Sequence, residues 1–188
     1  MKINKEVHTK YFMWFDLDGV FADFAHGVKQ YLGKEIIEDT DWHDCLRKAT
    51  KPTSGVNLFL DLPVLPDSVK YYNKVKTECN QNNIPVCFLT SISQKNTFAK
   101  KVKAEKMLWV INNIDPYAYI QFSKESMDKP NFIKHFNEKY FSHCKPPTHI
   151  LIDDYIAQKR VWTAAGGKFI LHTDWESSYQ QFKEIING

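Results

Sequence analysis

Two aspartates that stand two residues apart, Asp16 and Asp18, are the side chains of this sequence best suited to chemistry. They directly follow the apolar run Tyr11–Phe15, which has the length and composition of a strand buried on both faces. Like charges at this spacing repel each other unless a cation lies between them, and Mg²⁺ prefers carboxylate oxygens. Gly19 allows the sharp turn that would leave both acids at the tip of the strand. The pair therefore predicts a metal-binding acidic site, and a solvated Asp-x-Asp-Gly turn is the alternative.

Two later apolar runs end in polar side chains in the same way. One precedes Thr90 and Ser91, and the other precedes Asp153 and Asp154. Each run is followed by a stretch of helical composition, so strands and helices alternate, which predicts an α/β fold with a doubly wound parallel sheet. Ligands bind such sheets at the carboxyl ends of the strands. We therefore expect the polar residues of all three strand ends to converge.

The remaining segments are assigned around this core. A polar stretch, residues 34–57, interrupts the alternation and is interpreted as an insert over the tip of the first strand. After the first strand we expect strands at residues 85–89, 118–122, 149–152 and 168–172, and helices at residues 22–32, 68–80, 95–112, 130–140 and 155–165.

Composition limits the class of protein. With 188 residues, of which 43% are hydrophobic, the chain can form one core with a small insert. A net charge of +3, from 25 basic and 22 acidic residues, gives no strong signal of nucleic-acid or membrane binding. The four cysteines form no Cys-x-x-Cys pair and lack metal-ligand spacing, which favours reduced thiols. There is no signal-like leader and no long apolar run, so we expect a soluble, cytoplasmic protein, whose oligomeric state stays open.

The sequence resembles a known superfamily at four motifs. The segments Asp16-Leu17-Asp18-Gly19-Val20, Leu89-Thr90-Ser91, a later lysine and Ile152-Asp153-Asp154 resemble, in order, the signature motifs of the haloacid dehalogenase superfamily of phosphotransferases. Residues 18–24, 62–66, 90–91 and 105–110, and Asp153-Asp154 with Trp162 and Gly166-Gly167, look like the 5'(3')-deoxyribonucleotidase branch. The resemblance covers most of the chain. It implies a Mg²⁺-dependent phosphatase that acts on nucleoside monophosphates.

The resemblance also implies roles for the acidic residues. Asp16 would attack phosphorus and form an aspartyl-phosphate, and Asp18 would be the acid and base. Mg²⁺ would be held by Asp16, by the backbone carbonyl of Asp18 and by Asp153, with support from Asp154.

Phosphate binding is assigned to hydroxyl groups and one lysine. Thr90, together with Ser91, would donate hydrogen bonds to the phosphate oxygens. Lys106 would offset the negative charge, because Glu-Lys stands before Trp109 as it does in the nucleotidase branch. Some superfamily members place this lysine nearer the last motif, so Lys124 and Lys129 are the alternatives.

The resemblance further implies a cap and a nucleobase site. Residues 27–60 would form a small helical cap that shields the site from water, and residues 1–26 and 61–188 would form the core. Phe24 would contact the nucleobase, although a place in the core of the first helix explains this residue equally well.

Two other functions remain open at this stage. The first is phosphatase activity on another phosphomonoester, such as a sugar phosphate or a nucleic-acid 3'-phosphate end. The second is a receiver-like phosphoacceptor domain, which also combines acids, a hydroxyl and a lysine on a parallel sheet. A receiver has no aspartate two residues after the nucleophile, so Asp18 favours the enzyme. Base preference, sugar type and 5'- or 3'-phosphate are not decided by the sequence.

Overall fold

The chain forms one five-stranded parallel sheet. The computed structural model describes residues 9–33, 45–46, 48–49, 51, 55–92 and 99–188. The strand order is β3-β2-β1-β4-β5, and every neighbouring pair is parallel. The strands are β1 (Tyr11–Phe15), β2 (Val86–Ser91), β3 (Ile120–Ser123), β4 (Thr148–Asp153) and β5 (Lys168–Leu171).

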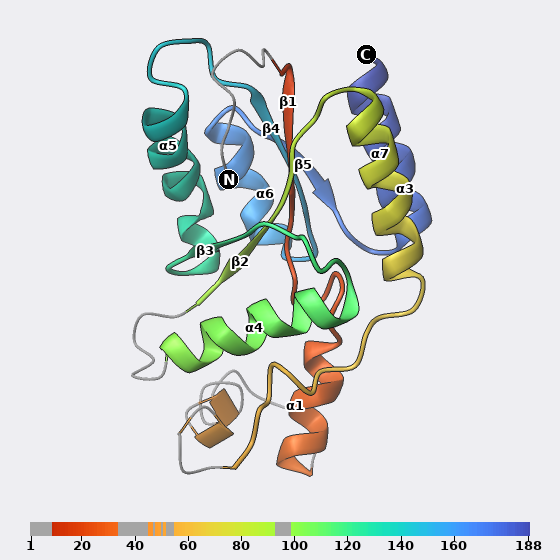
Figure 1. Cartoon of the computed structure of the whole chain (residues 1–188), viewed down its shortest axis with the longest axis vertical. Coiled ribbons are helices and arrows are strands. Elements are labelled where there is room, and N and C mark those ends of the chain that lie inside the picture. Colours follow the sequence, from red (N-terminus) through yellow and green to blue (C-terminus); the bar gives the residue numbers. More distant parts are fainter. Residues whose placement is uncertain (1–8, 34–44, 47, 50, 52–54, 93–98) are drawn as a thin grey trace.

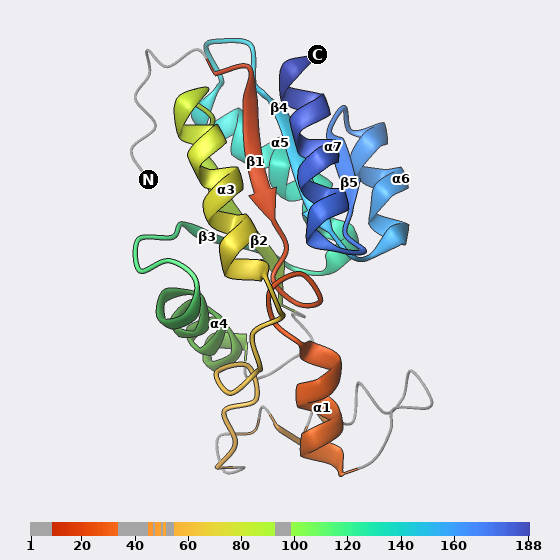
Figure 2. The ribbon, with the colours of Figure 1, turned by 90° about the vertical axis from the view of Figure 1, so that its right-hand side faces the viewer.

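Helices cover both faces of this sheet, so the predicted doubly wound α/β fold is confirmed (Figure 1). The helices α3 and α7 lie on one face and α5 and α6 on the other, whereas α1 and α4 lie near the carboxyl ends of the strands (Figures 1 and 2). Their bounds are α1 (Phe24–Leu32), α3 (Ser68–Gln81), α4 (Ala99–Asn113), α5 (Lys129–Tyr140), α6 (Ile156–Ala164) and α7 (Trp175–Asn187), with the short 3-10 helix η2 (Ser126–Asp128) before α5.

The central strand β1 is buried on both faces, as its composition predicts. Tyr11, Met13 and Phe15 point into the core shared with α3, α4 and α7. Phe12 and Trp14 point into a second core shared with α5 and α6. Side chains alternate along a strand, so five consecutive apolar residues anchor both layers and hold the tip of β1 rigidly.

The C-terminal helix α7 was not expected from the sequence. Asp174 begins it by accepting a hydrogen bond from the Ser177 amide at 2.8 Å, as a helix-capping residue does. Trp175 and Phe182 then pack into the core beside β1. This helix completes the layer on the α3 side.

About half of the predicted cap, namely residues 34–44, 47, 50 and 52–54, lies outside the described residues. Its proposed start at residue 27 falls inside α1, which is continuous from Phe24 to Leu32. The segment that returns from it is fixed to α4, because the Trp109 indole donates to the Leu62 carbonyl at 2.8 Å and the Phe59 amide donates to Glu105 at 3.2 Å. None of the helices in the described part of the chain is both long and apolar enough to cross a membrane.

Candidate active site

The loop after β1 turns tightly and brings the two motif aspartates to the carboxyl edge of the sheet. The Gly19 amide donates to the Ala22 carbonyl and the Phe21 amide to the Leu17 carbonyl, each at 2.9 Å. Gly19 has a φ of +76°, and a Cβ atom here would lie 2.0 Å from Oδ2 of Asp154. Only glycine satisfies both conditions, so the turn and the approach of the acidic loop after β4 depend on it.

Asp16 and Asp153 share one buried lysine. Nζ of Lys129 lies 2.9 Å from Oδ1 of Asp16 and 2.6 Å from Oδ2 of Asp153, and the lysine side chain is fully buried. Burial alone would lower the pKa of Lys129, but the charges of the two aspartates outweigh it and raise this pKa above its usual value. The ammonium group therefore stays charged between them.

Asp18 pairs with a different buried lysine. Nζ of Lys106 donates to Oδ2 of Asp18 at 2.5 Å, to Oγ1 of Thr90 at 2.9 Å and to the Ser91 carbonyl at 3.1 Å. Because Thr90 Oγ1 accepts from this lysine, its own hydrogen is free to donate elsewhere. A phosphate oxygen placed here would find a hydroxyl donor and an ammonium group side by side.

The surroundings of Asp18 raise its pKa above the usual value. Burial raises the pKa of Asp18 and the charge of Asp16 adds to the effect, whereas Lys106 opposes it. Oδ1 of Asp18 is buried and has no hydrogen-bond partner among the residues that the structure describes. This oxygen is therefore a suitable place to hold a proton.

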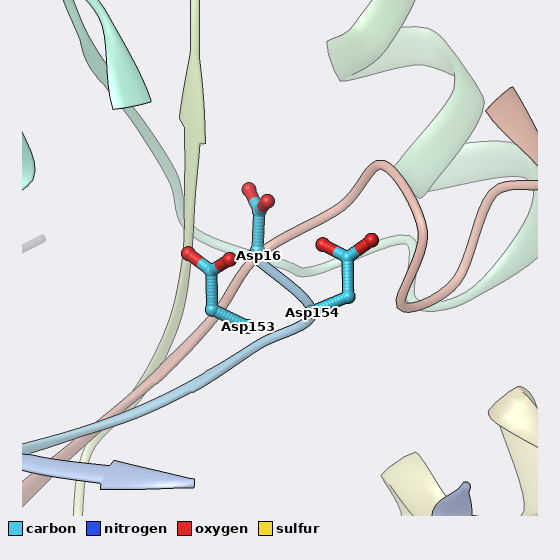
Figure 3. A group of neighbouring side chains, drawn as sticks. All are labelled: Asp16, Asp153 and Asp154. Atoms are coloured by element: carbon cyan, nitrogen blue, oxygen red, sulfur yellow. The ribbon is translucent and has the colours of Figure 1, made fainter. Parts of the chain in front are cut away.

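Three carboxylates could hold a metal ion. One oxygen from each of Asp16, Asp153 and Asp154 lies within 4.8 Å of the others, and the three side chains point to the same side of the strand ends (Figure 3). Burial, together with the negative charge of neighbouring aspartates, raises the pKa of Asp153 to about 6 and that of Asp154 to about 7. A divalent cation would relieve this repulsion, and oxygen ligands at this spacing fit Mg²⁺.

Two aromatic rings stand next to the lysine of this site. Phe24, at the start of α1, stacks on Phe59 with ring centroids 5.7 Å apart and planes 8° from parallel. Nζ of Lys106 lies over the Phe59 ring, 4.8 Å from its centroid. Phe24 is half-buried, so it is neither a pure core residue nor fully open to solvent.

The structure brings most of the sequence-predicted site residues together. Asp16, Asp18, Thr90, Lys106 and Asp153 meet at the carboxyl ends of β1, β2 and β4. Their assigned roles stay predictions.

Three further residues were assigned to the site, or offered as alternatives, from the sequence. The Ser91 hydroxyl lies 3.1 Å from the Ser123 hydroxyl on β3, so the backbone carbonyl of Ser91 is its contact with Lys106. Lys124 is exposed. Lys129, which the sequence offered only as an alternative to Lys106, is the lysine that contacts Asp16; its place directly before Pro130 at a helix start was the available signal.

Comparisons with known proteins give structural matches only. No family model and no curated protein match the sequence. A haloacid dehalogenase-like hydrolase from Streptococcus pneumoniae is similar in structure with a TM-score of 0.49, at 11% identity over 93% of this chain and 91% of that chain. A hydrolase from Streptococcus pneumoniae TIGR4 has the same TM-score at 13% identity, over 97% of this chain and all of that chain (100%).

Proposed function

We propose that the chain is a Mg²⁺-dependent phosphomonoesterase of the haloacid dehalogenase superfamily that hydrolyses (deoxy)ribonucleoside monophosphates through an aspartyl-phosphate. The observation that carries the proposal is that the two aspartates of one Asp-x-Asp motif are bound by two different buried lysines. Both aspartates are ion-paired, Asp16 with Lys129 and Asp18 with Lys106, but Asp18 also has a raised pKa and a buried oxygen that could hold a proton. Such a division suits a nucleophile and an acid-base group.

In the first half-reaction the Asp16 carboxylate attacks phosphorus, and the bond to the substrate alkoxide breaks. Asp18 gives its proton to that alkoxide. In the second half-reaction Asp18, now charged, takes a proton from water, which attacks the phosphorus of the phospho-enzyme and releases phosphate and Asp16. The pKa of Asp18 is raised, chiefly by burial, and this supports its role as the acid and base of the two transfers.

The phosphate oxygens would lie against the Thr90 hydroxyl and the Lys106 ammonium group, which are 2.9 Å apart. A bound Mg²⁺ would be held by Asp16, Asp153 and Asp154 and would neutralise and orient the phosphate. The stacked pair of Phe24 and Phe59 supports a nucleotide substrate, because it offers a flat aromatic wall beside Lys106 for a nucleobase.

The test is phosphate release from a panel of deoxyribonucleoside and ribonucleoside monophosphates and sugar phosphates, with Mg²⁺ or with EDTA. We expect Mg²⁺-dependent release from nucleotides, and a loss of at least about a thousandfold in Asp16→Asn. Asp61→Asn is the matched control, since Asp61 is exposed and forms no ion pair with another described residue. In Asp18→Asn, intact-protein mass spectrometry should detect a phosphoryl group on Asp16 that persists, because the base for the second step is gone.

Each other outcome has a definite meaning. Release from sugar phosphates alone would retain the mechanism and refute the nucleotide substrate. Phe24→Ala should raise KM for nucleotides but not for a small sugar phosphate; an equal effect on both would refute the stacking role. No release from any substrate would favour a phosphoacceptor domain.

A further inference from the structure

A basic groove lies beside the candidate active site, at the carboxyl ends of β2 and β3. It has a volume of about 220 Å³ and is lined by Lys100 and Lys103 of α4, by Phe122 and Ser123 of β3, and by Lys124. All three lysines are exposed. We call this cavity the lysine groove.

The three groove lysines have no charge partner, unlike their neighbours on α4. Within the described residues no carboxylate forms an ion pair with Lys100, Lys103 or Lys124. In contrast, Lys101 donates to the Val56 carbonyl and lies 3.4 Å from Glu105. An unbalanced group of three ammonium groups at a concave surface attracts an anion.

The lysine groove lies next to the residues of the predicted phosphate site. Ser123, in its lining, pairs in register with Ser91, and the Ser91 carbonyl accepts from Lys106 at 3.1 Å. Lys103 and Lys106 are three residues apart on α4, so they are neighbours on the helix surface within about one turn, or about 5.4 Å. A second anionic group about one sugar away from the reacting phosphate would therefore reach the groove.

We propose that the lysine groove binds a second phosphate group of the substrate. This inference rests on the proposed function and specifies its substrate class. The preferred substrates are nucleotides whose sugar carries two phosphate groups, such as a nucleoside 3',5'-bisphosphate: one phosphate reacts at Asp16 beside Thr90 and Lys106, and the other stays in the groove. The end of an oligonucleotide with a terminal phosphate presents the same pair of groups.

The test compares kcat/KM for phosphate release from nucleoside 5'- and 3'-monophosphates, the 3',5'-bisphosphate and a short oligonucleotide with a terminal phosphate. We expect the bisphosphate to exceed both monophosphates by about tenfold, through a lower KM. The double variant Lys100→Gln/Lys103→Gln should lose this advantage and leave monophosphate hydrolysis within about twofold of wild type. Lys145→Gln is the matched control, because Lys145 is exposed in the loop before β4 and so lies towards the amino end of that strand, whereas the groove lies at the carboxyl ends. The oligonucleotide arm identifies which source of the second phosphate is preferred.

Equal kcat/KM for the bisphosphate and the monophosphates would overturn the inference, and so would a double variant that weakens both substrates alike. Failure of the proposed function has a different signature, namely no phosphate release from any substrate. Even without phosphate release, the groove can be tested by measuring the binding of the bisphosphate to Asp16→Asn by calorimetry, because binding needs no turnover. Binding weakened about tenfold by the two groove substitutions would support the groove, and binding that they leave unchanged would refute it.

Discussion

Replacing Lys129 with methionine should destabilise the protein more than any exposed lysine substitution, and by an amount that depends on pH. Lys129→Met keeps the length of the side chain and removes the ammonium group that lies between Asp16 and Asp153. Removing one partner from a buried ion pair costs about 3–5 kcal/mol, because the remaining charges are left uncompensated. We expect a loss of this size in the free energy of unfolding at pH 8, in EDTA.

The loss should become smaller as the pH is lowered. The pKa of Asp153 is about 6 even with Lys129 in place, and without the lysine the repulsion from Asp16 raises it further. The folded variant then binds a proton that the unfolded chain does not bind, so acid stabilises the folded state by up to about 1.4 kcal/mol for each pH unit below the raised pKa. The difference from wild type should therefore be smaller at pH 5 than at pH 8, because the variant takes up this proton at a higher pH than wild type, which does so near pH 6.

The assay is urea unfolding of wild type, Lys129→Met and Lys134→Met at pH 5 and pH 8. Lys134 is exposed on the same helix and is the matched control, for which we expect a change of less than about 0.5 kcal/mol. A loss in Lys129→Met below about 1 kcal/mol, or one of equal size at both pH values, would refute the account of Lys129 as the shared cation of two buried carboxylates.

Two further predictions concern the core on the α5 and α6 side. In Gly167→Ala a Cβ atom would lie 2.3 Å from the buried Trp162 indole nitrogen, so thermal unfolding should show a loss of about 1–3 kcal/mol, and an unchanged melting temperature would contradict the packing. Burial lowers the pKa of His149 from 6.5 to about 4. The folded state therefore prefers the neutral imidazole, and its full stabilisation is present above pH 6.5. As the pH falls from 6.5 towards 4, the free energy of unfolding should decrease by about 3 kcal/mol. His149→Gln should therefore flatten the fall in unfolding free energy over this window, leaving the part due to His172, whose pKa burial also lowers to about 4; an unchanged slope would refute the assignment.

Much of the fold could be predicted because its information is local. The run Tyr11–Phe15 is apolar at every position, and only a central strand buries both of its faces. The strand β1, and the polar residues that follow it, could therefore be assigned from residue types and their order in the sequence. The edge strand β3 was shifted by two residues from the expected range at its start, since Ile120–Ser123 is short and only partly buried. The helix α7 was missed although its apolar residues recur at helical spacing, beginning with Trp175 and ending near Phe182, and Asp174 precedes them as a cap.

The contacts of the two site lysines could not be predicted from the residues that surround them in the sequence. Lys106 and Lys129 are two of 25 basic residues, and the signals beside them, Glu-Lys before Trp109 and the position before Pro130, do not show which aspartate each lysine contacts. What decides their roles is a pair of contacts with Asp18 and Asp16 that span 88 and 113 positions of the chain. The two lysines also arrive from opposite sides: α4 packs into the core of the α3 layer, and α5 into the other. Each layer of helices therefore supplies a cation to a different aspartate of the motif, whereas the sequence-based prediction chose a single lysine.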